Sequence, residues 1–291
     1  MFKKTGIYIG ILLAFITLSV QPQTASETAK IGAAKVVEKK LASKLMARDM
    51  PYRVILPVRY NEEKDKRYST VYLLHGLTGH YDNWTDKTKL AEFAALHNYI
   101  LITPEGDNGW YTDSALTPND KYESYIIKEL IPEIDKTYRT VADRGHRAVA
   151  GLSMGGYGGM KFGIKYPQMF SLAGSFSGAL EAASFTEKNA GPIGKGIDGI
   201  FGAEGSELRK ENDIFGLVKM MSAEQIKALP FLYVDCGTED FLYKSNREFA
   251  GLLVEKKIPH EFRELPGGHN WVFWNSQVKE FLEVADDRLG K

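Results

Sequence analysis

The sequence predicts an α/β fold in which a mostly parallel central sheet carries helices on both faces. Short apolar runs typical of strands alternate with stretches whose apolar residues recur at helical spacing. With 44% hydrophobic and 25% charged residues, the 291-residue chain has the composition of a globular protein, and α/β folds of this size often form one domain. We therefore expect residues 26–291 to form a single domain that follows an N-terminal leader.

The expected strands are short runs rich in branched apolar and aromatic residues. They cover residues 52–58, 70–74, 99–103, 148–150, 172–175, 231–234 and 261–265. Three helices are expected where apolar residues share one helical face, at residues 123–138, 154 to about 166, and 276–289. Pro132 lies inside the first helix, at a position where we expect a kink.

Residues 179–229 do not follow the same alternation. Five glycines fall between Gly191 and Gly202, and no clean strand or helix period is visible. We interpret this segment as an insertion between two strands. Such an insertion can form a lid over a site.

The N-terminus has the pattern of a secretory signal peptide, which we assign to residues 1–25. Lys3 and Lys4 precede an apolar run from Ile7 to Val20, which gives way to polar and small residues. This run is shorter than the roughly 20 residues of a membrane-spanning helix, although a permanent anchor remains the alternative. The pattern predicts a secreted or periplasmic protein with no stable membrane association once the leader is removed.

The charge balance and the cysteine content disfavour a nucleic-acid partner and exclude stabilisation by an internal disulfide. The 37 Lys and Arg residues balance 37 Asp and Glu residues, so no net positive field favours nucleic acid as a partner. The single cysteine, Cys236, cannot form an internal disulfide. Because it ends the apolar run 231–236, we expect it to be buried as a small hydrophobic residue.

A candidate nucleophile follows the strand at 148–150. The sequence Gly151-Leu-Ser153-Met-Gly155 has the Gly-x-Ser-x-Gly form and leads into a stretch compatible with a helix. In a nucleophile elbow, this turn from strand to helix is so tight that the serine backbone is strained and glycines make room for neighbouring backbone. The context therefore predicts that Ser153 lies exposed at the carboxyl end of the sheet, as a nucleophile for acyl transfer.

A serine hydroxyl needs a general base, and the base needs an acid that orients it. His269 lies in a glycine-containing loop after the strand at 261–265, whereas His260 precedes that strand. We therefore expect His269 to be the base. Asp240, in the loop after the strand at 231–234, is the preferred acid; Glu239 is the second choice and Asp235 the third.

The reaction also needs two backbone amides that stabilise the oxyanion of the tetrahedral intermediate. We expect one from Met154, the residue after the nucleophile, and one from Leu77 in the glycine-containing loop 75–79. His75 in the same loop is interpreted as a structural histidine.

Two other patterns carry little weight. Gly194-Lys-Gly196-Ile-Asp-Gly199 fits a dinucleotide-binding motif, but it follows a polar segment instead of a strand. The histidines lack the spacing of a zinc site. No cofactor and no metal are therefore implied.

Together these motifs resemble the esterase D-like putative esterase family over about residues 44–282. That family includes feruloyl and acetylxylan esterases of carbohydrate esterase family one, tributyrin-type esterases, S-formylglutathione hydrolases and mycolyltransferases of the antigen 85 group. The resemblance implies an α/β-hydrolase fold and places its catalytic triad at Ser153, Asp240 and His269. It also implies that the Leu77 and Met154 amides are the oxyanion donors.

The resemblance implies a serine carboxylic ester hydrolase, and the leader favours an acetyl or feruloyl ester of plant polysaccharide or its oligosaccharides as substrate. S-formylglutathione hydrolysis, general short-chain esterase activity and acyl transfer to a sugar hydroxyl are the alternatives. Trp84, Trp110 and Tyr111 lie in loops similar to those that border the cleft in relatives, so they are candidate substrate-binding residues. Trp84 and Trp110 could equally be packing aromatics.

Overall fold

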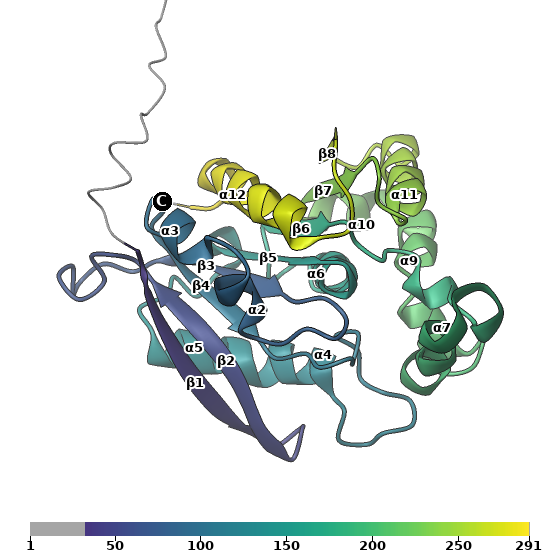
Figure 1. The fold of residues 1–291 in the computed structure, drawn as a ribbon, viewed down its shortest axis with the longest axis horizontal. Coiled ribbons are helices and arrows are strands. Elements are labelled where there is room, and N and C mark those ends of the chain that lie inside the picture. Colours follow the sequence, from purple (N-terminus) through teal and green to yellow (C-terminus); the bar gives the residue numbers. More distant parts are fainter. Residues whose placement is uncertain (1–32, 291) are drawn as a thin grey trace, which may run out of the picture.

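The protein is built on one eight-stranded sheet, seen in a computed structural model that describes residues 33–290 (Figure 1). The strand order is β1-β2-β4-β3-β5-β6-β7-β8. β1 pairs with β2 and β2 with β4 in antiparallel fashion, and the remaining neighbours are parallel. The strands are β1 (Lys35–Ser43), β2 (Arg48–Leu56), β3 (Ser69–Leu74), β4 (Tyr99–Pro104), β5 (Arg147–Leu152), β6 (Leu172–Phe176), β7 (Phe231–Gly237) and β8 (His260–Leu265).

Each strand expected from the sequence overlaps one observed strand, from β2 to β8. β1 was not predicted. Its sequence is rich in lysine, and most of its side chains are exposed because it is the antiparallel edge of the sheet. Charged residues on an edge strand reduce pairing with other chains, and they also remove the apolar pattern by which a strand is recognised.

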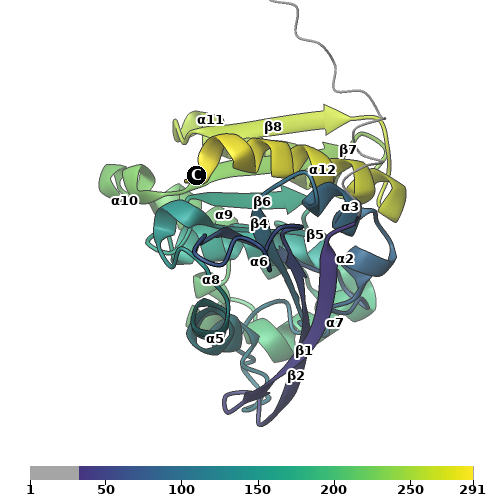
Figure 2. The same ribbon diagram turned by 90° about the vertical axis from the view of Figure 1, so that its left-hand side faces the viewer.

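Helices cover both faces of the sheet and bury a separate apolar core on each side (Figure 1). One core packs against α2 (Asn83–Asp86), α3 (Leu90–Ala94) and α12 (Trp271–Arg288). The other packs against α4 (Tyr122–Tyr125), α5 (Ile131–Thr137), α6 (Met154–Lys165), α9 (Ile214–Met220) and α11 (Tyr243–Glu255). Figure 2 shows α12 running along β6 and β7, which it contacts. The predicted α/β-hydrolase arrangement is confirmed.

The expected helix at 123–138 is present, but its middle differs from a regular α-helix. A π-helical segment, Ile126–Leu130, joins α4 to α5, and Pro132 lies in the first turn of α5. Proline lacks an amide donor and crowds the preceding turn, so it fits at a helix start more easily than in a helix interior. The expected kink therefore takes the form of a local widening directly before Pro132.

The C-terminal helix begins earlier than the sequence suggested. α12 starts at Trp271 because the Asn270 side chain accepts hydrogen bonds from the amides of Val272 and Phe273 and so caps the helix. α11 was not predicted as a separate helix. Its exposed face carries many charged residues, and its apolar face includes Phe249 and Leu253.

Residues 179–229, the predicted insertion, lie between β6 and β7 and are mostly helical. They contain a short 3₁₀ turn and α7 (Glu187–Phe201), α8 (Glu207–Glu211), α9 and α10 (Ala223–Ala228). α7 is broken at Gly191, whose φ of 54° is outside the helical range. This break lets the glycine-rich stretch form helical turns that the sequence pattern did not reveal.

The predicted signal peptide, residues 1–25, lies outside the described residues. Between residues 33 and 290, none of the helices combines the length and the apolar character that crossing a bilayer requires.

Candidate active site

The predicted elbow joins the end of β5 to the start of α6. Ser153 lies between the two elements with φ 53° and ψ −116°, a conformation that is strained for a residue with a side chain. A Cβ on Gly151 would lie 2.7 Å from the Leu74 carbonyl oxygen, and one on Gly155 would lie 2.6 Å from the His75 carbonyl oxygen. Both glycines are therefore required by the close approach of the β3 end to the elbow.

The backbone of Ser153 is also fixed by the last residue of β6 and by the segment that follows this strand. Its amide donates to the Phe176 carbonyl oxygen at 3.0 Å, and its carbonyl oxygen accepts from the Ala179 amide at 3.0 Å. These two hydrogen bonds offset part of the cost of the strained turn.

His269 connects the serine to an acid through both of its ring nitrogens. Its Nε2 lies 3.0 Å from the Ser153 Oγ, and its Nδ1 lies 2.8 Å from the Asp240 Oδ2. The two residues come from the loops after β8 and β7, which reach the same end of the sheet as the elbow because these strands are parallel. The structure thus brings together the three residues that the sequence singled out.

Asp240 is buried and well supplied with donors. Its Oδ1 accepts from the Leu242 amide at 2.8 Å, and its Oδ2 faces His269. Burial raises the pKa of this carboxyl, but the hydrogen bonds from His269 and the Leu242 amide outweigh burial, so the pKa lies below its usual value. Asp240 is therefore an anion near neutral pH and stabilises a positive charge on the imidazole.

The lower-ranked alternatives lie elsewhere. Glu239 is exposed to solvent, and Asp235 is buried inside β7, where burial raises the pKa of its carboxyl well above the usual value. His260 lies at the start of β8, at the opposite end of this strand from His269. None of the three has a hydrogen bond to Ser153 or His269 within residues 33–290.

The two amides expected to stabilise the oxyanion, those of Leu77 and Met154, have no acceptor within the described part of the chain. Met154 is the first residue of α6, where helix amides are unpaired and the helix dipole favours negative charge. The Thr78 amide, next to Leu77, donates to the Asn108 Oδ1 at 2.7 Å, which holds this part of the loop in place.

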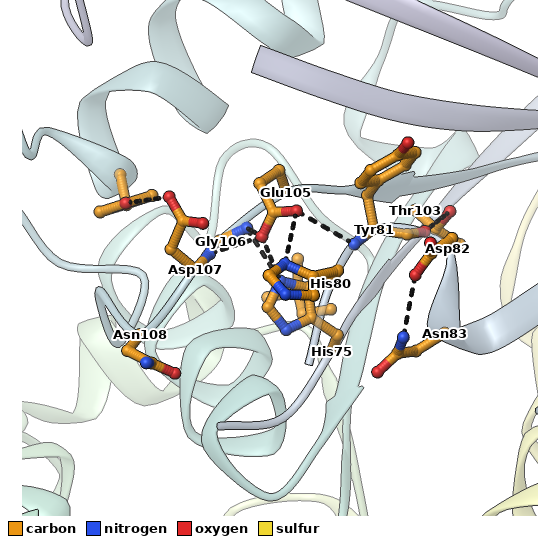
Figure 3. A network of polar contacts seen from close by, with 12 residues as sticks. His75, His80, Tyr81, Asp82, Asn83, Thr103, Glu105, Gly106, Asp107 and Asn108 are labelled. Atoms are coloured by element: carbon orange, nitrogen blue, oxygen red, sulfur yellow. Dashed lines mark hydrogen bonds and ion pairs between the residues drawn. The ribbon is translucent and has the colours of Figure 1, made fainter. Parts of the chain in front are cut away.

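Glu105 anchors the loop that carries Leu77 through its contacts with His75 and His80, which are drawn in Figure 3. One carboxylate oxygen lies 3.1 Å from the His75 Nε2 and accepts from the Asp107 amide at 2.7 Å, while the other lies 3.2 Å from the His80 Nδ1. Although burial raises the pKa of Glu105, the contacts with His75 lower it to about 2. His75 is buried here, as its structural interpretation predicts, and the Tyr111 hydroxyl donates to its carbonyl oxygen at 2.9 Å.

The same network contains the one group within residues 33–290 that could hold a metal ion by distance, namely His80, Glu105 and Asp107. Its oxygens already accept hydrogen bonds from the protein: Asp107 Oδ2 accepts from Arg48 and Tyr122, each at 2.6 Å. The arrangement is explained as an anchor for the two loops. Cys236 is buried as expected, and burial raises the pKa of its thiol to about 12.

A cleft of about 420 Å³ opens beside Ser153. Several of its walls are aromatic: Phe241, Trp271 and Trp274 line it together with Leu77, Ile193 and His269. The rings of Phe241 and Trp274 lie 4.6 and 4.9 Å from the His269 ring, centroid to centroid. The sequence motifs did not indicate these aromatic residues as cleft walls, although they stand within five positions of Asp240 or His269.

The three candidate substrate-binding aromatics have other positions. Trp84 and Tyr111 are fully buried, and the Trp84 indole N–H donates to the Leu74 carbonyl oxygen at 3.0 Å. Both are packing residues here and do not line the cleft. Trp110 is 4% exposed and lines a neighbouring, smaller pocket of about 280 Å³, which shares Leu77, Thr78 and Ile193 with the cleft.

Known proteins resemble this chain over most of its length. The family described as putative esterase matches residues 43–283. An acetyl esterase of Caldicellulosiruptor saccharolyticus is 29% identical over 252 residues, which cover 83% of this chain and 94% of that protein. A solved ferulic acid esterase is 28% identical with a TM-score of 0.77, and the match covers 89% of this chain and 99% of that one.

A second solved structure, the fluorophosphonate-binding serine hydrolase FphF of Staphylococcus aureus, is 26% identical with a TM-score of 0.77 and covers 87% of this chain and 98% of its own. The resemblance read from the motifs is thus confirmed by family, relatives and fold. The chain belongs to the putative esterase family and is a carboxylic ester hydrolase of the serine esterase type.

Proposed function

We propose that this protein hydrolyses carboxylic esters through an acyl-enzyme formed on Ser153. The observation that carries the proposal is the hydrogen-bonded series Ser153–His269–Asp240 at the wall of an aromatic-lined cleft. The Leu77 and Met154 amides, which have no acceptor within residues 33–290, support it, because an oxyanion needs donors of this kind.

In the first half-reaction, the Ser153 oxygen attacks the ester carbonyl carbon while its proton passes to the His269 Nε2. Asp240 stabilises the resulting imidazolium, and the Leu77 and Met154 amides donate to the negatively charged oxygen. When the carbon–oxygen bond to the alcohol breaks, the proton on His269 passes to the leaving alkoxide. The products of this step are a free alcohol and an acyl group bound to Ser153.

In the second half-reaction, water takes the place of the alcohol. His269 accepts a proton from the water as its oxygen attacks the acyl carbon, and the proton then returns to the Ser153 oxygen as the acid leaves. A sugar hydroxyl could replace water in this step, in which case the product would be an acylated sugar. Product analysis with a sugar present distinguishes hydrolysis from such transfer.

For the substrate, we propose acetyl or feruloyl esters of plant polysaccharide or its oligosaccharides. Two matched proteins are named as an acetyl esterase and a ferulic acid esterase, and each is 28% or more identical to this chain. The aromatic walls of the cleft suit both a hydroxycinnamoyl ring and the apolar face of a sugar. We further propose that the leader directs the protein out of the cytoplasm, because such polymers are found outside the cell.

The test compares initial rates on p-nitrophenyl acetate, p-nitrophenyl butyrate and methyl ferulate for purified wild-type protein and the Ser153→Ala variant. We expect turnover that depends on Ser153, with ferulate preference indicating removal of hydroxycinnamate and acetate preference indicating deacetylation. If none of the three esters is turned over in a serine-dependent way, the proposed mechanism is wrong.

A further inference from the structure

Lys87 places a positive charge in the wall of the active-site cleft. It follows α2 directly and lines the same cleft as Ser153 and His269. Apart from His269, it is the one ionisable side chain among the cleft-lining residues of the described chain, and no Asp or Glu lines this cleft. The cleft therefore offers an approaching substrate a cation without a neighbouring carboxylate.

Nearby acids are engaged with other groups. Asp86, next to Lys87 in sequence, pairs with Arg53, and the Asp82 carboxylate accepts from the Asn83 side chain at 2.9 Å. Within residues 33–290, Lys87 has no ion pair and its ammonium donates no hydrogen bond. Its three N–H donors are thus available to a ligand.

Trp271 positions this charge. The Lys87 Nζ lies 5.3 Å from the centre of the Trp271 ring, a distance typical of a cation–π contact. Trp271 is itself held edge-on by Trp84 and Trp274, with ring centres 5.6 and 5.2 Å away. Trp271 lines the same cleft as Ser153 and His269, so this contact keeps the ammonium in the wall of that cleft.

We propose that Lys87 forms an anion-binding subsite, and that the preferred esters of this enzyme carry a carboxylate on their acyl or alcohol part. This inference rests on the proposed function of Ser153 and names the substrate class for that same site. On the alcohol side, a uronic acid residue in an acetylated or feruloylated polysaccharide has this chemistry. On the acyl side, a dicarboxylic acid esterified at one end has it and would take the place of the acetyl or feruloyl group proposed above. A carboxylate on the substrate would replace water around the ammonium and gain a charge-assisted hydrogen bond.

The exposure of Lys87 sets the expected size of the preference for anionic over neutral esters. Because solvent reaches its side chain, a single ion pair there is worth about a two- to fivefold preference. Raised salt should reduce this preference, since exposed charges are screened.

The experiment measures kcat/KM for two matched pairs of esters. On the acyl side, p-nitrophenyl butyrate is compared with mono-p-nitrophenyl succinate; on the alcohol side, phenyl acetate is compared with 4-carboxyphenyl acetate. Each pair gives a ratio of anionic to neutral ester for wild type, Lys87→Gln, Lys87→Glu and Lys89→Gln. Comparing ratios between proteins cancels the intrinsic reactivity of each ester.

We expect the ratio for at least one pair to fall two- to fivefold in Lys87→Gln and further in Lys87→Glu, and the pair that responds tells which side of the ester carries the charge. Lys89→Gln is the matched control, because Lys89 is exposed two positions away and does not line the cleft. Ratios that stay unchanged in both Lys87 variants, while turnover still depends on Ser153, overturn the subsite and leave the proposed function standing. Loss of Ser153 dependence on every ester overturns both.

Discussion

Ser153 is held by two kinds of constraint: a strained backbone conformation and contacts with residues far away in the sequence. His269 and Asp240 lie 116 and 87 positions after it, yet both reach it from loops at one end of the sheet. Each of these residues could be predicted because the residue type, the order along the chain and the preceding strand agreed. Glu105 gave no such signal, since its partners belong to a different loop that only the folded sheet brings near.

At the residue scale, we expect Ser153→Ala and His269→Ala each to remove most of the turnover of p-nitrophenyl acetate without unfolding the protein. Asp240→Asn should lower kcat by about 10⁴-fold, because the asparagine no longer favours the reactive tautomer of His269. Initial rates measure the loss, and circular dichroism verifies the fold. Glu239→Gln is the control: a large loss there, together with full activity in Asp240→Asn, would show that the acid was assigned wrongly.

At the scale of single elements, the loop of residues 75–82 depends on the carboxylate of Glu105, which directly follows β4. Strands β2 to β8 and three of the helices could be predicted from the periodicity of their apolar residues. This loop has no such periodicity, and neither has the insertion that contributes Ile193 to the cleft. The aromatic residues predicted to bind substrate also show that a sequence motif alone does not tell which way a side chain packs. Trp84 and Trp110 stand in conspicuous loop motifs, yet tertiary packing directs Trp84 into the core and leaves the cleft walls to Phe241, Trp271 and Trp274.

We expect Glu105→Gln to lower kcat for p-nitrophenyl acetate by about tenfold or more with a smaller change in KM. Glutamine preserves the shape of the side chain but replaces an acceptor oxygen by a donor. The loop therefore loses part of its anchor, and the Leu77 amide moves from its position. Complete loss of one oxyanion donor lowers kcat by about 10²–10³-fold. Steady-state kinetics separate the two constants. An unchanged kcat in a folded variant would show that the loop keeps its place without this carboxylate.

At the scale of the whole molecule, the class of fold and the positions of most strands along the chain could be predicted, because parallel strands buried on both faces leave a strong apolar signal. The edge strand β1 was invisible for the opposite reason. The buried charges were also beyond prediction. Lys161, fully buried on α6, pairs with Glu123 at 2.8 Å and donates to the Asn212 Oδ1 of the insertion at 3.1 Å, so one ammonium group joins three distant segments.

The buried carboxylates of Glu105 and Glu123 predict how the stability of the protein depends on pH. Burial raises the pKa of Glu105 and of Glu123, but His75 and Lys161 lower both to about 2 from an ordinary 4.5. The unfolded chain therefore binds more protons than the native one between these values, so stability is present above pH 4.5 and is lost as pH falls toward 2. Each of the two pKa shifts contributes about 3 kcal/mol at most to the free energy of unfolding.

Urea unfolding at pH 6, 4 and 3 measures this dependence. We expect the free energy of unfolding to drop steeply across the series in wild type and less steeply in Glu123→Gln, which starts from a lower stability because it leaves Lys161 without its partner. Equal slopes in the two proteins would contradict the role given to Glu123.

The two hydrogen bonds that join the Ser153 backbone to Phe176 and Ala179 have a consequence for how such an enzyme diversifies. They fasten the nucleophile to Phe176, the last residue of β6, and to Ala179, the first residue of the insertion, whose helical turns begin only beyond Ala179. New sequences can therefore be exchanged between that attachment and β7, reshaping the walls that meet the substrate while the reacting serine keeps its place. Substrate selectivity can therefore change during evolution while the reactivity of the serine is retained.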